Sequence, residues 1–116
     1  MKSLFILNDP PYGTERSYNG LRLANALARR DGEEVRVFLL GDAAACAKAN
    51  QKVPQGYYNL ELMLRALARQ QAEIGVCGTC MDARGIADAE LAPGCRRSTL
   101  EELAAWAGWA ERTYVF

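Results

Sequence analysis

Two cysteines three positions apart are the residues of this chain whose type and spacing best suit covalent chemistry. Cys77 and Cys80 come at the end of the short apolar run 73–77, which is typical of a buried strand. The thiolate is the reactive form of cysteine, and the free amides and partial positive charge of a helix start lower the pKa of a thiol. Thr79 and Asp82 have the spacing of a helix cap, which predicts that Cys80 is the first residue of a helix. Both sulfurs are therefore candidate catalytic nucleophiles.

The spacing of these cysteines supports three chemistries. Dithiol–disulfide exchange requires one accessible thiol of low pKa and a second thiol nearby. Persulfide carriage requires one nucleophilic cysteine, and a second can resolve the persulfide. A tetrahedral zinc site would need two further ligands, and since the chain has no histidine only Cys46, Cys95 and carboxylates remain. We therefore expect no metal site, and we expect no cofactor. The simpler alternative is that Cys77 is a small buried residue that ends a strand.

Composition and charge exclude several function classes. With 116 residues, 50% of them apolar and 24% charged, the chain has an ordinary globular composition, and we expect a single domain over residues 1–116. Fourteen basic residues balance fourteen acidic ones, so no long-range field favours nucleic acid or an anionic membrane as a partner. No apolar run approaches the roughly 20 residues that span a bilayer, and the amino end lacks a signal-peptide core. We therefore expect a cytoplasmic protein with reduced thiols.

The order of the apolar and amphipathic segments predicts an α/β fold. Apolar runs typical of strands alternate with segments of helical periodicity. The expected strands are 3–7, 34–40, 73–77, 94–98 and 113–116. The expected helices are 14–30, 42–50, 58–71 and 99–110, with a short one ending at Gly85. Such alternation predicts a three-layer α/β/α sandwich around a mainly parallel five-stranded sheet.

Ligands of open parallel sheets bind beyond the carboxyl ends of the strands, where the loops 8–16, 41–46 and 77–82 should meet. The first loop opens a helix, so its glycine and the helix-start amides are a candidate anion site. It lacks the spaced glycines and the lysine of a phosphate loop. The alternative is that this loop only turns the chain and caps the helix. Its candidate binding residues are Asn8, Tyr12, Gly13, Thr14 and Glu15.

The loop after the third strand supplies the other candidate binding residues, which are Gly78, Thr79 and Arg84. Arg84 lies one turn beyond Cys80 and could favour a thiolate, although a side chain that points to solvent would contribute little. Trp106 and Trp109, three apart on the last helix, are expected to pack in the core or at an interface and not to bind a cofactor. Tyr57, Tyr58 and Asn59 could wall a pocket or bury a subunit contact, and we favour the contact.

These motifs together resemble the DsrE/DsrF family of sulfur-relay proteins. The shared features are the loop Tyr12-Gly13-Thr14 that runs into a helix, and a strand-end cysteine, Cys77, that precedes Arg84-Gly85. The resemblance extends over essentially the whole chain through the order of its elements, and it implies a DsrE/DsrF-like fold. The motifs are moderately specific together and weak apart.

The resemblance also implies a function and partners. In the relay proteins the strand-end cysteine receives and passes on a persulfide sulfur, and Cys77 falls on that position. Cys80 stands where the relay subunits tend to have a small apolar residue, which leaves dithiol chemistry open. The resemblance further implies a sulfur-donor or sulfur-acceptor protein as partner and assembly as a homo-oligomer, a trimer or hexamer. An enzyme of this kind would be sulfurtransferase-like.

The leading hypothesis is therefore a sulfur carrier in which Cys77 accepts sulfur and Cys80 is the second thiol. Loop amides and Arg84 would favour the thiolate. Two alternatives stay open from the residues alone. One is an oligomeric module that binds a small anion or nucleotide without covalent chemistry, and the other is a dithiol redox protein.

Overall fold

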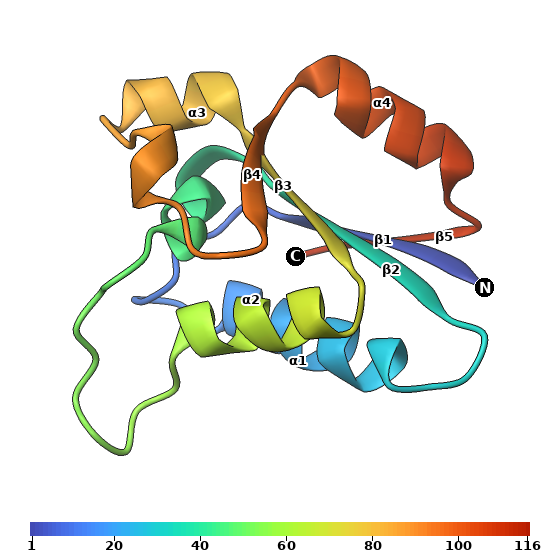
Figure 1. Ribbon diagram of the computed structural model, residues 1–116, viewed down its shortest axis with the longest axis horizontal. Coiled ribbons are helices and arrows are strands. Elements are labelled where there is room, and N and C mark those ends of the chain that lie inside the picture. Colours follow the sequence, from blue (N-terminus) through green and yellow to red (C-terminus); the bar gives the residue numbers. More distant parts are fainter.

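A five-stranded sheet with helices on both faces forms the framework of the protein (Figure 1). The computed structural model describes residues 1–116. The strands are β1 (Lys2–Leu7), β2 (Glu34–Leu39), β3 (Glu73–Cys77), β4 (Cys95–Ser98) and β5 (Arg112–Val115). They lie in the order β4-β3-β2-β1-β5, and every neighbouring pair is parallel. The predicted three-layer α/β/α sandwich is confirmed, and the sheet that we expected to be mainly parallel is wholly so.

The helices form the two outer layers. They are α1 (Arg16–Ala28), α2 (Leu60–Arg69), α3 (Gly78–Ala83) and α4 (Leu100–Trp109), with 3-10 helices η1 (Gly41–Ala47) and η2 (Asp88–Glu90). The pair α1 and α2 covers one face of the sheet, whereas α3 and α4 lie on the other side (Figure 1). None of these helices combines the length and the apolar character that crossing a lipid bilayer requires.

Most helices are one or two residues shorter at each end than predicted. The helix expected from residue 14 begins at Arg16, and the Thr14 hydroxyl donates to Asp9 at 3.2 Å and accepts the Arg16 amide at 3.3 Å. The helix expected over 58–71 begins at Leu60, because the Asn59 side chain accepts the Leu62 amide and caps it. The segment expected as a helix over 42–50 is the 3-10 helix η1.

The sheet separates two apolar clusters of unequal size. The cluster under α1 and α2 contains 18 buried residues, including Phe5, Val37 and Leu64. The cluster under α4 contains five, which are Leu4, Phe38, Cys77, Leu103 and Trp106. Trp106 is 4% exposed and packs edge-on against Phe38, with ring centroids 5.9 Å apart. The expected packing role of this tryptophan is confirmed.

Charged groups supplement the small cluster and hold α4 on the sheet. The Arg36 guanidinium stacks 3.9 Å from the ring centroid of Trp109 and pairs with Glu73 at 2.8 Å. At the other end of the helix, Arg96 pairs with Glu102 at 2.6 Å. The start of α4 is capped by Thr99, whose hydroxyl accepts the Glu102 amide at 3.2 Å.

Candidate functional site

The two candidate nucleophiles lie where β3 runs directly into α3. Cys77 is both the last residue of β3 and the N-cap of α3, so the helix begins at Gly78. The predicted cap at Thr79 is therefore wrong, since Thr79 lies inside the helix and Cys77 is the N-cap. The Thr79 hydroxyl instead lies 3.3 Å from the Cys77 sulfur. Cys80 is consequently the third residue of α3 and not the first.

Gly78 lies where β4 approaches this turn closely. A Cβ at this position would lie 2.8 Å from the Arg97 guanidinium and 3.1 Å from the Ser98 carbonyl oxygen. Both distances are shorter than ordinary van der Waals contact, so a larger residue would displace the Arg97 side chain and shift the Ser98 carbonyl by a few tenths of an ångström. Arg97 also donates to the Gly78 carbonyl at 3.1 Å. The glycine thus keeps the reactive turn packed against its neighbouring strand.

The surroundings of Cys77 favour its thiolate. Burial opposes ionisation of this thiol, but hydrogen bonds from the Cys80 thiol, the Thr79 hydroxyl and the amides of both residues outweigh it. The pKa of Cys77 therefore lies below its usual value of 9.0. All of these donors are neutral and belong to the first turn of α3. The thiolate is stabilised by the helix start and not by a cation.

Cys80 has the opposite tendency. Burial raises its pKa, and so do its hydrogen bond to Cys77 and the negative charge of Cys77. Two groups act in the other direction, namely the Gly41 amide, which donates to the Cys80 sulfur at 3.1 Å, and the charge of Arg84. Of the two thiols, Cys77 is thus the one that ionises first.

Arg84 does not act where we expected. Its guanidinium pairs with Asp42 at 2.7 Å and donates to the Cys80 carbonyl at 3.0 Å, so it ties α3 to η1. Its charge lowers the pKa of Cys80 but is not among the causes that lower the pKa of Cys77. The expectation that Arg84 favours the thiolate therefore applies to the second thiol only.

A cavity of about 860 Å³ opens onto the two cysteines. Cys77 is only 8% exposed, so its sulfur is reached through this cavity. The wall is formed by the α3 turn, the end of β4, the start of α4 and the exposed Leu100. Its charged residues are Asp82, Asp88, Glu101 and Arg97. Acidic side chains therefore outnumber basic ones around the opening.

Arg97 is a residue of this site that the sequence did not indicate. It donates to Asp88 at 2.6 Å and to Asp82 at 3.0 Å, and thereby links β4 to α3 and η2. It lies beside the turn because β4 pairs with β3, with Cys77 opposite Ser98. No motif marks it, because its position depends on strand pairing between segments of the chain that have no recognisable spacing.

The loop after β1 does not join the cysteine cavity as a whole. Asn8 is close to it, since the Asn8 carbonyl oxygen lies 3.8 Å from the position of a Cβ on Gly41. The Asn8 side chain itself donates to the Phe116 carbonyl at 3.2 Å. Glu15 is exposed and caps α1 without a side-chain hydrogen bond. Thr14 bonds to Asp9, as described above.

Tyr12 and Gly13 line a separate cavity of about 390 Å³ with Gly56, Tyr57 and Tyr58. The Tyr12 and Tyr58 rings lie 5.5 Å apart, and the Tyr12 hydroxyl accepts the Leu60 amide at 3.4 Å. Gly13 has φ of 100°, a conformation that side chains rarely adopt. The predicted binding residues are thus divided between two places in the fold.

The other two cysteines are buried in the larger apolar cluster or packed against it. Cys46 is fully buried, and Cys95 is half-buried. Burial raises the pKa of each thiol to about 12, so neither forms a thiolate near neutral pH. No group of three or more His, Cys, Asp or Glu side chains is placed to hold a metal ion.

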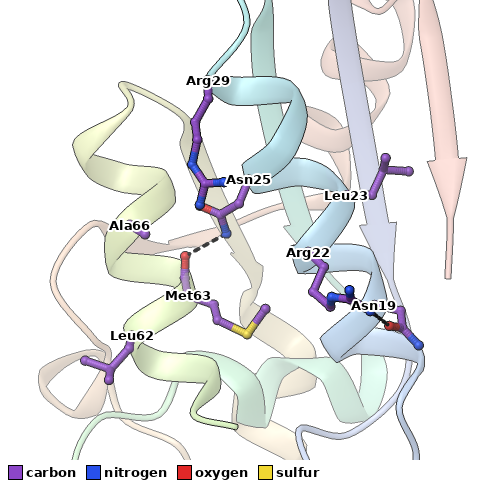
Figure 2. Close-up of a pocket in the computed structure, with 8 residues that line it drawn as sticks. All are labelled: Asn19, Arg22, Leu23, Asn25, Arg29, Leu62, Met63 and Ala66. Atoms are coloured by element: carbon purple, nitrogen blue, oxygen red, sulfur yellow. Dashed lines mark hydrogen bonds between the residues drawn. The ribbon is translucent and has the colours of Figure 1, made fainter.

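A further cavity of about 680 Å³ lies between α1 and α2, on the other side of the sheet from α4 (Figure 2). Figure 2 shows that Asn25 points from α1 to the Met63 carbonyl of α2, to which it donates at 3.2 Å. Arg22 and Arg29 also line this groove. The groove lies between two helices, and no cysteine lines it.

Comparisons with known proteins agree with this geometry. The chain is 38% identical over 116 residues to protein YchN of Escherichia coli, a match that covers 99% of this chain and 98% of that protein. It is 34% identical to the uncharacterized protein MJ0989 of Methanocaldococcus jannaschii, over the full length of both. The crystal structure of the E. coli YchN protein superposes with a TM-score of 0.91 at 37% identity, and all of both chains is covered.

A protein of unknown function from Methanobacterium thermoautotrophicum, MTH1491, shares the fold with a TM-score of 0.75 at 14% identity, covering 99% of this chain and 98% of that chain. The model of the DsrE/DsrF-like family matches residues 1–116. This match and the identity to YchN support the resemblance that the loop and the strand-end cysteine indicated. The chain belongs to the DsrE/DsrF-like family.

Proposed function

We propose that this protein is a sulfur carrier of the sulfur-relay type, in which Cys77 accepts a sulfane sulfur as a persulfide. The observation that carries the proposal is the Cys77 thiol itself, whose pKa is lowered and which forms part of a cavity wall. Membership of the DsrE/DsrF-like family supports the same function. A transfer of this kind needs a nucleophile and a docking surface, so the absence of histidine is no obstacle.

The transfer is a displacement at sulfur. The Cys77 thiolate attacks the outer sulfur of a donor persulfide, the sulfur–sulfur bond of the donor breaks, and the donor leaves as a thiolate. Cys77 then carries the sulfur atom as a persulfide. The hydrogen-bond donors around Cys77 stabilise the thiolate, so a larger fraction of this thiol is in the attacking form at neutral pH. Thr79 and the amides of α3 are positioned to serve this step.

The cavity has room for a group presented by another protein. Its opening carries Leu100, which is 66% exposed, and the acidic residues Asp82, Asp88 and Glu101. An apolar and acidic opening suits a donor or acceptor protein better than a small inorganic anion, which the carboxylates would repel. We further propose that the protein acts in the cytoplasm as a homo-oligomer, a trimer or hexamer.

An anion- or nucleotide-binding module has less support from this geometry. The Thr14 hydroxyl and the Arg16 guanidinium, which could otherwise hold an anion, both face Asp9, at 3.2 and 3.6 Å. Gly13 lines a cavity whose other members are a glycine and three tyrosines. The loop after β1 therefore offers no unpaired cation to an anion.

Intact-mass spectrometry after incubation with glutathione persulfide tests the proposal. We expect a mass increase of about 32 Da, one sulfur atom, in the wild type. We expect the same increase in the matched control Cys95→Ser, which removes a thiol that is not ionised near neutral pH. We expect no such increase in Cys77→Ser. An adduct that persists in Cys77→Ser, or the absence of an adduct from both the wild type and Cys80→Ser, would refute the assignment.

A further inference from the structure

We propose that Cys80 is a resolving thiol, which attacks the sulfur-loaded Cys77, expels hydrosulfide and leaves a Cys77–Cys80 disulfide. This step rests on the proposed function, since it needs a persulfide on Cys77. It adds an activity to sulfur carriage, because a sulfur atom that no acceptor collects leaves as sulfide. The protein would then keep the persulfide sulfur on Cys77 for a limited time only.

The geometry of the α3 turn brings the two sulfurs together. Cys77 is the N-cap of α3, and Cys80 is the third residue of the helix. These are the two positions whose side chains meet across the first turn in a capping box. Both residues line the same cavity, and Cys80 packs against the small apolar cluster that contains Cys77. The Cys80 thiol also hydrogen bonds to the Cys77 sulfur, so the two sulfurs face each other in this turn.

The groups around Cys80 activate it only after Cys77 has reacted. In the free protein burial, the hydrogen bond to Cys77 and the negative charge of Cys77 all raise the pKa of Cys80. When Cys77 carries a sulfur atom, its own sulfur no longer holds that charge. The Gly41 amide, 3.1 Å from the Cys80 sulfur, and the charge of Arg84 remain, and both favour the Cys80 thiolate. Loading of the first thiol thus prepares the second.

The reaction balances without an external oxidant. The Cys80 thiolate attacks the Cys77 sulfur of the neutral persulfide, and a bond forms between the two cysteine sulfurs. The bond to the outer sulfur breaks, and the electron pair leaves on hydrosulfide. The two cysteines are oxidised while the sulfane sulfur is reduced to sulfide. A dithiol reductant then restores both thiols and prepares the protein for another cycle.

A single-turnover experiment tests this step. The protein is loaded with glutathione persulfide and freed of donor by gel filtration, and intact mass and free sulfide are followed with time. In the wild type and in Cys95→Ser we expect the loaded species to decay to one about 2 Da lighter than the reduced protein, with one equivalent of sulfide. In Cys80→Ser and Cys80→Ala we expect sulfide release at least tenfold slower, and the added sulfur should stay in place.

The outcomes separate this inference from the proposed function. If wild type and both Cys80 variants keep the added sulfur equally long, Cys80 does not resolve the persulfide, while sulfur carriage stands. If only the Cys80 variants show the loaded mass, and the wild type shows the disulfide at once, resolution is supported and is faster than the gel filtration. If no protein acquires sulfur, the proposed function fails and this inference fails with it. Agreement between the Ser and Ala variants excludes an effect of the new hydroxyl.

Discussion

The two faces of the sheet differ in how their helices are held and in what their cysteines can do. The face under α1 and α2 is packed by 18 buried residues, whereas the face under α4 has five and relies in addition on arginine, glutamate and tryptophan side chains. Hydrophobic burial stabilises a fold by far more than exposed ion pairs do. The larger cluster therefore provides most of the stability, and the thinner face leaves a cavity beside Cys77.

The four cysteines follow this division. Cys46 belongs to the large cluster and Cys95 packs against it, and burial raises the pKa of both to about 12. Cys77 belongs to the small cluster and has a lowered pKa. Cys80 packs against both clusters, at the junction between the two faces. The fold thus keeps two thiols inert and presents two others at one turn.

The largest expected effect is on stability, and it tests whether the two apolar clusters contribute unequally to the free energy of unfolding. We expect Leu64→Ala, which empties a fully buried position under α2, to lower the free energy of unfolding by about 3–4 kcal/mol. Leu103→Ala under α4 removes a residue that is 8% exposed, and we expect a loss of about 2 kcal/mol. Urea denaturation followed by circular dichroism measures both. Equal losses would contradict the division of stability between the faces.

The next effect is on thiol reactivity, measured as alkylation by iodoacetamide in the native protein at pH 7. A pKa of about 12 leaves about 0.001% of Cys46 as thiolate, whereas a pKa below 9.0 leaves at least about 1% of Cys77 ionised. The weaker intrinsic nucleophilicity of a less basic thiolate reduces this advantage, to about 30-fold or more in rate. Peptide mapping against time gives the two rates. Similar rates would mean that the α3 turn does not activate Cys77.

The smallest effect concerns the charged groups that hold α4. Hydrogen bonds from Arg96 and Ser98 lower the pKa of Glu102 below its usual value of 4.5. A carboxyl group with a lowered pKa stabilises the folded state above that usual value, and this contribution is lost as the pH falls below it. Because Glu102 is partly exposed, we expect a loss of less than about 1 kcal/mol.

Hydrogen exchange between pH 6 and pH 3 would locate this loss. We expect amides of α4 to lose protection before those of α2, whose packing is apolar. The variant Glu102→Gln should remove most of the difference, because its side chain does not titrate. Simultaneous loss of protection in both helices would show that the charged groups do not hold α4 separately from the rest of the fold.

Much of the architecture could be predicted because it depends on local patterns. The strand 73–77 was predicted with its observed bounds, since an apolar run preceded by a polar turn marks a buried strand clearly. Helix ends were less predictable, as at Thr79, because a hydroxyl that could cap a helix finds another partner in the folded protein. Such competition between partners is not visible in residue spacing.

The sequence by itself determined that two cysteines share one turn, because residues three apart at the start of a helix must lie close together. Only the tertiary structure decided which of them ionises. The amide of Gly41 reaches Cys80 from the loop after β2, and packing of the fold buries both thiols. It also separated Tyr12 and Gly13 from the cysteines. A thiol pKa depends on every dipole and charge within a few ångströms. The donors to Cys77 come from its own turn, whereas the burial of both thiols and the approach of Gly41 to Cys80 exist only in the packed fold.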